Sequence, residues 1–381
     1  MTSHLTRRGF VAGATVLAPG LALAAPQKAQ LAIPPSVISN PPRQWGPGAP
    51  VSPYPDPDVI VVDPVFSRLR VALSGIKRLA TGFQWAEGPA WCAAGQYALF
   101  SDVQGDVQYR YIWETGEVTA FRKPSYNSNG NGFDYEGRQL SCQDFLRRVV
   151  RWEHDGSLKV LADNYRGQPL NSPNDIAAHK DGSVWFTDPM FGMSLAEGHP
   201  DAPGQGNNQA GLYDPYVGAG GISIGPQKQE LPANVYRWDP SGRLDIVVPF
   251  EPGRNPNGIA LSPDCSLLYL ALGGRLWVAD INGATVSNLR QLTDCMIDGV
   301  QCGPDGFRVD RAGNIWGSCG GTLGYTGVAC WSPQGKLLGR IRLPEICANL
   351  CFAGPKRDHL FMTASQSIYL LRVGIQGAAP G

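Results

Sequence analysis

The stretch that decides the fold runs from Asn174 to Asp188 and reads NDIAAHKDGSVWFTD. It begins with a polar residue, continues through a short mixed run to a turn marked by Gly182, and ends in a second, apolar run over residues 184–186. A glycine turn between two short runs rich in β-formers predicts a strand, a tight turn and a second strand. The same pattern recurs elsewhere in the chain.

The pattern occurs six times. The opening residues, called the openers below, are spaced 42, 45, 83, 48 and 44 residues apart: Glu87, Asn129, Asn174, Asn257, Asp305 and Asn349. Glycine or aspartate follows five of the six openers. The position eight residues after the opener holds Gly95, Gly137, Gly182, Cys265, Gly313 and Arg357, in chain order. The regular placement of these residues indicates an internal structural repeat.

A second hairpin is predicted in most repeats, because Trp113, Trp152, Trp238 and Trp331 each precede a turn sequence with glycine. One repeat therefore holds about four strands, and a period in the forties with four strands is typical of a β-propeller blade. We expect an all-β, six-bladed propeller over residues 70–375. The long spacing of 83 residues predicts an insertion at about 190–231. In the sixth blade we expect only two strands, at about 358–364 and 367–373, with residues near 70–79 supplying the missing strands and closing the ring.

Composition narrows the classes of partner. The 381 residues hold 32 basic and 32 acidic side chains, so the formal net charge is zero. A neutral chain is not expected to bind nucleic acid or an anionic membrane surface through charge. Beyond the N-terminus no apolar run reaches the roughly 20 residues that span a bilayer, so we expect no membrane partner.

The N-terminus predicts export. Arg7 and Arg8 form a twin-arginine motif, an apolar run follows to Leu23, and residues 22–24 read Ala-Leu-Ala, as at a signal cleavage site. We therefore expect residues 1–24 to be a twin-arginine signal peptide, the export machinery to be a partner of the precursor, and the mature protein to be periplasmic. Residues 25–69 are proline-rich and are interpreted as a linker or wrapping arm.

Nine cysteines leave the disulfide pattern open. Cys295/Cys302 and Cys319/Cys330 are candidate pairs by their closeness in sequence, but connectivity cannot be deduced from spacing. The chain has no Cys-x-x-Cys, so a structural zinc site has little support.

The openers are the candidate functional residues. In a propeller the inner strand of each blade lines one central channel, so polar residues at equivalent places converge. Two carboxylates and several amide oxygens would form an oxygen cage for a divalent cation, with calcium expected first and magnesium or zinc as alternatives. We predict as metal ligands Glu87, Asn174, Asn257 and Asp305. Asn129 and Asn349 either join the cage or line the channel. The competing interpretation is that each Asn-Gly is a turn and that Glu87 is a solvated charge.

The motifs around these openers resemble a known family. They are Glu87-Gly88-Pro89, Pro173-Asn174-Asp175, Phe186-Thr187-Asp188-Pro189, Pro256-Asn257-Gly258 and Pro304-Asp305-Gly306. The ordered set is similar to that of the gluconolactonase, regucalcin and senescence-marker-protein family. The resemblance implies a six-bladed propeller, a catalytic divalent metal on Glu87, Asn174, Asn257 and Asp305, and hydrolysis of sugar lactones. The chain departs from many members in two places: Gln143-Asp144 replaces a Glu-His pair, and Ser172 replaces an arginine.

The function expected from these residues is metal-dependent hydrolysis of a sugar-type lactone. The cation would stabilise the oxyanion as water attacks, and Asp305 is the candidate general base, with Asp144 a weaker candidate. The alternatives are another ester or organophosphate hydrolase on the same cage, or a non-catalytic propeller that binds calcium or a partner. A Gly-x-Ser-x-Gly match at 221–225 lacks the strand–turn–helix context of a serine nucleophile. The insertion at 190–231 is either a lid over the substrate or a surface decoration.

Overall fold

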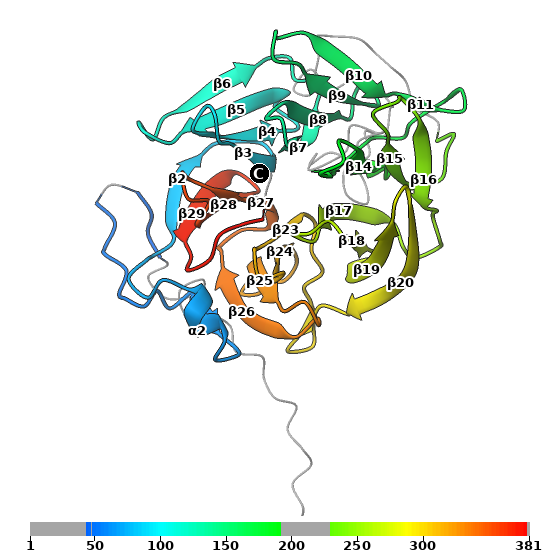
Figure 1. The fold of residues 1–381 in the computed structure, drawn as a ribbon. Coiled ribbons are helices and arrows are strands. Elements are labelled where there is room, and N and C mark those ends of the chain that lie inside the picture. The colour runs from blue at the N-terminus through cyan, green and yellow to red at the C-terminus, as the bar shows by residue number, and fades with distance from the viewer. Residues whose placement is uncertain (1–42, 47, 192–228, 379–381) are drawn as a thin grey trace, which may run out of the picture. The chain divides into compact units, whose positions relative to one another are not determined.

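Each of the six repeats folds into one antiparallel sheet, and the six sheets surround a common axis (Figure 1). The computed structural model describes residues 43–46, 48–191 and 229–378. Blade 1 consists of β3 (Ala86–Cys92), β4 (Tyr97–Asp102), β5 (Val107–Ile112) and β6 (Val118–Arg122). Blade 2 consists of β7 (Ser128–Phe133), β8 (Gln139–Gln143), β9 (Arg148–Trp152) and β10 (Leu158–Ala162). Blade 3 consists of β13 (Ile176–Ala178), β14 (Val184–Thr187), β15 (Val235–Trp238) and β16 (Leu244–Val248).

The other three blades follow the same order from the axis outward. Blade 4 consists of β17 (Pro256–Leu261), β18 (Leu267–Leu272), β19 (Arg275–Asn282) and β20 (Thr285–Thr293). Blade 5 contains β23 (Phe307–Val309), β24 (Ile315–Cys319), β25 (Gly327–Trp331) and β26 (Leu337–Arg342). Blade 6 contains β27 (Cys347–Ala353), β28 (His359–Ala364) and β29 (Ser367–Arg372). Two short hairpins lie between blades, β11–β12 (Asn164–Tyr165, Gln168–Pro169) and β21–β22 (Met296–Ile297, Val300–Gln301). The predicted six-bladed all-β propeller is confirmed.

The predicted tight turn between the first two strands of each blade is confirmed by backbone angles. Five of the six residues placed eight after an opener have a positive φ, from 50° to 86°: Gly137, Gly182, Cys265, Gly313 and Arg357. In blade 1 the positive φ falls on Gln96, one residue later than predicted. Glycine adopts this conformation without steric cost, whereas Cys265 and Arg357 adopt it under strain that the surrounding hairpin must hold.

The sixth blade closes the ring with strands from both ends of the chain. Three of its strands come from the C-terminal side and the fourth is β2 (Lys77–Thr81), which pairs with β29. The prediction of only two C-terminal strands was wrong, because the segment that carries the opener Asn349 is itself a strand, β27. One N-terminal strand is therefore enough to complete the blade, which has four strands in the order β27, β28, β29 and β2 from the channel outward.

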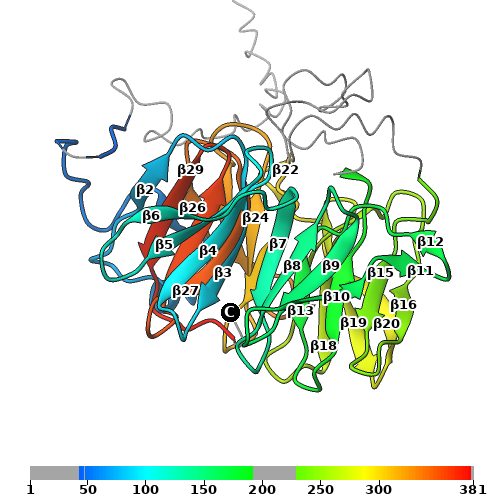
Figure 2. The ribbon, with the colours of Figure 1, turned by 90° about the horizontal axis from the view of Figure 1, so that it is seen from above.

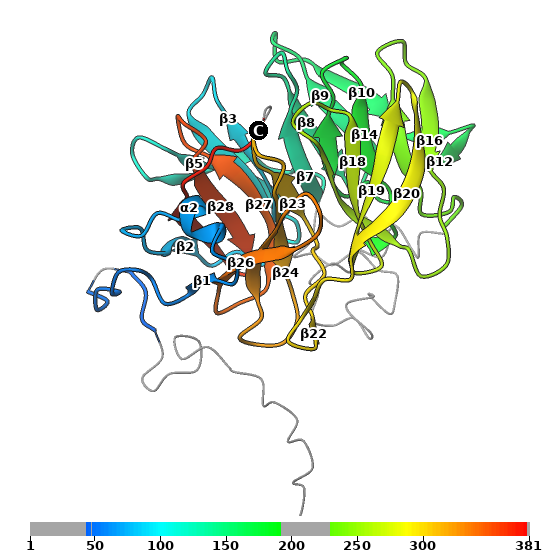
Figure 3. The same cartoon turned by 60° about the horizontal axis from the view of Figure 1, so that its bottom comes forward.

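The described part of the proline-rich arm packs onto blades 5 and 6. β1 (Val59–Val61) pairs with β26 and makes blade 5 five-stranded, and α2 (Phe66–Leu69) follows next to it (Figure 3). Arg43 makes ion pairs with Asp56 at 2.9 Å and with Asp58 at 2.8 Å, and Asp58 also pairs with Arg342 of β26 at 3.2 Å. These contacts cover the outer edge of blade 5, which would otherwise present unpaired backbone groups.

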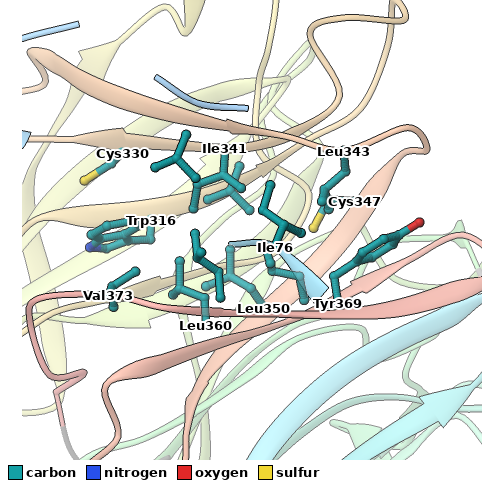
Figure 4. Packing of buried hydrophobic residues seen from close by; sticks show 14 of the residues in the cluster. Ile76, Trp316, Cys330, Ile341, Leu343, Cys347, Leu350, Leu360, Tyr369 and Val373 are labelled. Atoms are coloured by element: carbon teal, nitrogen blue, oxygen red, sulfur yellow. The ribbon is translucent and has the colours of Figure 1, made fainter. Parts of the chain in front are cut away.

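The core lies between neighbouring sheets. Figure 4 shows the layer between blades 5 and 6, where Trp316 and Ile341 of blade 5 face Leu350 and Leu360 of blade 6. All four side chains are fully or almost fully buried. Removing this apolar area from water is the main force that holds one blade against the next, and it fixes the inner strands around the channel.

Several predictions concern residues whose structure is not described. The predicted signal peptide over 1–24, the arm up to residue 42, most of the insertion and the Gly-x-Ser-x-Gly match lie outside the described residues. All nine cysteines are buried free thiols, so neither candidate disulfide pair is joined. Within residues 43–46, 48–191 and 229–378, no helix has the length and apolar character needed to cross a membrane.

Candidate metal centre

The six openers meet at one end of the central channel, because each lies at the start of an inner strand. Glu87, Asn129, Asn257 and Asn349 lie within β3, β7, β17 and β27, while Asn174 and Asp305 come just before β13 and β23. Neighbouring blades are joined here by backbone hydrogen bonds. The N–H of Gly130 donates to the carbonyl of Asn174 at 2.7 Å, and the N–H of Gly258 donates to the carbonyl of Asp305 at 2.8 Å. Figure 2 shows the inner strands from the side, and at their other end Gly377 forms an isolated bridge with Asp310, which follows β23.

The glycine after an opener allows this close approach between blades. A Cβ on Gly88 would lie 1.8 Å from the carbonyl oxygen of Asn129, and one on Gly306 would lie 2.0 Å from Cγ of Asn349. Real Cβ atoms do not come this close to other heavy atoms, so only glycine fits. The interpretation of each Asn-Gly as a turn is wrong, since Gly130 and Gly258 lie inside β7 and β17.

Glu87 is the most perturbed acid of the centre. Its side chain is buried, and its pKa is raised well above the ordinary value by burial, then by the charge of Asp305 and by that of Asp175. Two contacts favour its charged form: the N–H of Gly88 donates to Oε2 at 2.6 Å, and the side chain of Asn349 hydrogen-bonds to the carboxylate. The interpretation of Glu87 as a solvated surface charge is therefore wrong.

Asn257 has an acceptor without a donor. Its Oδ1 atom is buried and has no hydrogen-bond partner among the described residues. A buried unpaired amide oxygen costs about 1–3 kcal/mol unless something outside the protein chain satisfies it. This oxygen and the acidic pair have the chemistry that a hard divalent cation requires, so the residues present fit such an ion.

The described residues gather no three His, Cys, Asp or Glu side chains at one point. A cage at the openers would therefore depend on asparagine oxygens as well as on Glu87 and Asp305, as the sequence pattern predicts. Ligation by the four predicted residues stays a prediction. Asn349 orients Glu87. Its Oδ1 accepts a hydrogen bond from the N–H of Leu350 at 2.9 Å, and its side chain hydrogen-bonds to Glu87.

Sequence reasoning missed a buried ion pair directly below the openers. Arg308 of β23 pairs with Asp175 at 3.2 Å across the channel, and the two side chains are 13% and 1% exposed. Asp175 stands at the position that is glycine after most openers, and this exception was the only signal in the sequence.

A second missed group is Asp188, which follows β14. Burial raises the pKa of Asp188 to about 8, although the N–H of Asn171 donates to its Oδ2 at 2.9 Å. Its Oδ1 is buried and has no hydrogen-bond partner in the part of the chain that the structure describes. The side-chain amide of Asn171 donates to the carbonyls of Asp188 at 3.0 Å and Pro232 at 3.3 Å, so this cluster ties together the two ends of the insertion.

The two positions that depart from the family pattern are buried. Ser172 donates its hydroxyl to the carbonyl of Pro189 at 3.0 Å. Asp144 is 1% exposed, and its backbone N–H donates to the carbonyl of Asn127 at 3.2 Å.

The sequence and fold agree with those of known proteins. The family model of the SMP-30/Gluconolactonase/LRE-like region matches residues 85–366. The chain belongs to this family. A gluconolactonase of Zymomonas mobilis is 30% identical over 323 residues, covering 78% of this chain and 81% of the relative. The solved structure of a gluconolactonase from Xanthomonas campestris is 28% identical with a TM-score of 0.68, covering 86% and 99%.

Another solved structure shares the fold at lower identity. The structure of a calcium-binding protein, regucalcin, from Agrobacterium tumefaciens is 17% identical with a TM-score of 0.58, covering 80% of this chain and 94% of the other. These comparisons confirm the predicted SMP-30/gluconolactonase family membership. Since the relatives of higher identity carry the name of a lactone-hydrolysing enzyme, they also confirm the prediction of an enzyme.

Proposed function

We propose that this family member hydrolyses a sugar-type lactone and requires a divalent cation held by Glu87, Asn174, Asn257 and Asp305. Calcium is the first ion we expect, because the donors are all oxygen and two of them are anionic; magnesium and zinc are alternatives. The observation that carries the proposal is the close pair of carboxylates, the buried Glu87 and the partly exposed Asp305, whose mutual repulsion a cation would relieve.

The substrate class is supported by the two relatives named gluconolactonase. Lactone hydrolysis as such follows from the family, whereas the sugar-type substrate is our proposal. The changed positions Ser172 and Asp144 are buried, so they do not by themselves argue for a different substrate.

The chemistry assigns separate tasks to the chain's own residues. A divalent cation bound at the openers would polarise the lactone carbonyl and lower the pKa of a water molecule. Asp305 accepts a proton from the attacking water, whose oxygen bonds to the carbonyl carbon. When the ring C–O bond breaks, the same carboxyl returns the proton to the leaving alkoxide, and the product is a hydroxy acid. Glu87 supplies the second negative charge and is held in place by Asn349.

The position of Asp305 suits this task. Its backbone N–H donates to the hydroxyl of Ser318 on the next strand at 3.1 Å, and its carbonyl accepts from Gly258 of blade 4. The backbone is thus fixed from two sides while the residue remains partly exposed. Asp144 is the weaker candidate for the base, because it comes at the end of β8, whereas Asp305 comes just before an inner strand.

The test measures metal content and turnover on one preparation. Mature protein would be assayed with glucono-1,5-lactone, other lactones, aryl esters and an organophosphate, before and after treatment with chelator. We expect lactone turnover that disappears with chelator and returns with Ca²⁺. Preference for esters or organophosphates would support another hydrolase on the same cage. Metal binding without any turnover would support a non-catalytic propeller, and full activity in chelator would refute metal dependence.

We also propose that the protein works in the periplasm after export by the twin-arginine machinery. The support is the order of Arg7-Arg8, the apolar run and the Ala-Leu-Ala site at residues 22–24. This route carries folded proteins, which is compatible with a cation already bound.

A further inference from the structure

A buried ion pair crosses the channel one layer below the openers. Nη1 of Arg308 donates to Oδ2 of Asp175 at 3.2 Å, and Nη2 donates to Oδ1 at 3.4 Å. Nη1 also donates to the carbonyl of Phe307 at 2.8 Å. Two parallel bonds between a guanidinium and a carboxylate fix the orientation of both groups, which a single contact does not.

The pair and its backbone contacts involve three blades. Oδ2 of Asp175 accepts the N–H of Ile259 at 3.3 Å, and Oδ1 accepts the N–H of Ile176 at 2.9 Å. Each residue of this layer closely follows a proposed ligand in the chain: Asp175 is one residue after Asn174, Ile259 two after Asn257, and Arg308 three after Asp305. One carboxylate therefore links the three chain segments, at the starts of β13, β17 and β23, that carry three of the four proposed ligands.

The pair lies between the two ends of the channel. Asp175 packs against the glycine that follows the opener Asn129, since a Cβ on Gly130 would lie 2.7 Å from the Cα of Asp175. Arg308 also lines a cavity of about 70 Å³ that extends toward Ala378 near the C-terminus. The ion pair is thus the layer directly beneath the proposed metal centre, and the cavity lies on its other side.

We propose that the Asp175–Arg308 ion pair is a positioning device that holds Asn174, Asn257 and Asp305 at the separation a divalent cation requires. The inference rests on the proposed function in one respect, that a cation binds at the openers. Residues behind the direct ligands orient them, and changing such residues typically weakens metal binding by about 10–100-fold.

A role through charge alone makes a different prediction. Asp175 is a third carboxylate near the centre, and Arg308 neutralises it. If only this field mattered, Arg308→Gln would tighten cation binding and Asp175→Asn would weaken it. Positioning predicts the same sign for both, because either change breaks the two-point contact.

The experiment titrates the full mature chain with Ca²⁺ and with Mg²⁺ and measures binding by calorimetry. A thermal melting curve of each variant measures its stability. We expect Arg308→Gln and Asp175→Asn each to weaken Ca²⁺ binding by about tenfold or more. The double variant should be no weaker than the weaker single variant, since both changes break one interaction. Arg308→Lys keeps the charge but loses the fork, so it should recover only part of the affinity.

A matched control is the buried Arg237 of β15. It pairs with Asp239 at 2.9 Å and with Asp181 at 3.2 Å, and this ion pair does not lie in the channel. Arg237→Gln should lower the melting temperature and leave Ca²⁺ affinity unchanged. If a single variant does not fold, the double variant decides, because it leaves no unpaired buried charge.

Wild-type affinity in the double variant would overturn the inference, as would opposite signs in the two single variants. A wild-type protein that binds neither ion would overturn the proposed metal centre and this inference together. The two failures are therefore distinguishable.

Discussion

Glu87 on blade 1 and Asp305 on blade 5 are two acids brought together by blade 6. Gly306 follows Asp305 and packs against the side chain of Asn349, which in turn hydrogen-bonds to Glu87. Burial and then the charge of Asp305 raise the pKa of Glu87 well above its usual value. The fold therefore maintains an unfavourable pair of charges at one end of its channel. A bound cation would relieve the repulsion between them, and this relief would favour cation binding.

The first prediction concerns this acidic pair. Glu87→Gln and Asp305→Asn should each weaken Ca²⁺ binding by more than about tenfold and abolish most lactone turnover, because each removes half of the anionic ligand charge. Isothermal titration and a pH-indicator assay would measure the two effects. Glu114→Gln, on the exposed turn after β5, is the control and should change neither. Full activity of both channel variants in chelator would rule out the metal mechanism.

The second prediction concerns the unpaired oxygen of Asn257. Asn257→Ala should leave the metal-free protein as stable as the wild type or more stable, because it removes a buried acceptor to which no described residue donates. The same variant should lose most of the rise in melting temperature that Ca²⁺ gives the wild type. Melting curves with and without Ca²⁺ would show both. A large loss of stability without metal would mean that the side chain has a structural partner.

Much of the fold followed from the sequence because the repeat is local. The opener, the turn eight residues later and the following apolar run specify one hairpin, and six copies predict six blades. The predicted number of strands in blade 6 was wrong, and the pairing of β1 with β26 was not predicted. Both depend on contacts between distant parts of the chain. A pattern within one repeat carries no information on which segments meet across the ring.

The site was predicted only as a set of residue types. That the openers converge follows from propeller geometry, but the burial of Glu87 and the pairing of Asp175 with Arg308 do not. These features arise from three-dimensional neighbours on other blades. The role of the glycine that follows four of the six openers was likewise hidden, because Asn-Gly is common in turns and the close packing of this glycine becomes visible only between strands.

The third prediction concerns that glycine. Gly306→Ala should destabilise the fold by about 1–3 kcal/mol and weaken Ca²⁺ binding, because the new methyl group would displace Asn349. Urea unfolding and calorimetric titration would measure the two losses. Gly132→Ala on β7 is the control, since its Cβ would come no closer than 3.7 Å to a neighbour. Equal stability of the two variants would show that Asn349 moves without cost.

The fourth prediction concerns export. Replacing Arg7 and Arg8 together by lysine should leave the precursor in the cytoplasm, because the arginine pair is the address that the export receptor reads. Cell fractionation followed by immunoblotting would locate the protein. Lys28→Arg, beyond the predicted cleavage site, should be exported as the wild type is. Normal periplasmic delivery of the double variant would refute the twin-arginine assignment.

The last prediction concerns pH and Asp188. Burial raises the pKa of this carboxyl from an ordinary value near 4 to about 8, so the folded protein retains the proton over a range in which the unfolded chain has lost it. The unfolded state then binds fewer protons, and the free energy of unfolding falls as the pH rises from about 4 to about 8. The stability that Asp188 contributes is thus complete at the acidic end and is lost toward pH 8.

Asp188→Asn should remove this dependence, because asparagine is neutral at every pH and keeps an acceptor for the N–H of Asn171. Relative to the variant, the wild type should lose about 1.4 kcal/mol of unfolding free energy per pH unit in the middle of the range. Urea unfolding at pH 5, 6.5 and 8 would measure the difference, with Asp155→Asn on an exposed turn as the control. A constant difference between wild type and Asp188→Asn would mean that Asp188 is ionised in the folded protein, and that its unpaired oxygen is satisfied by a partner that stabilises the charge.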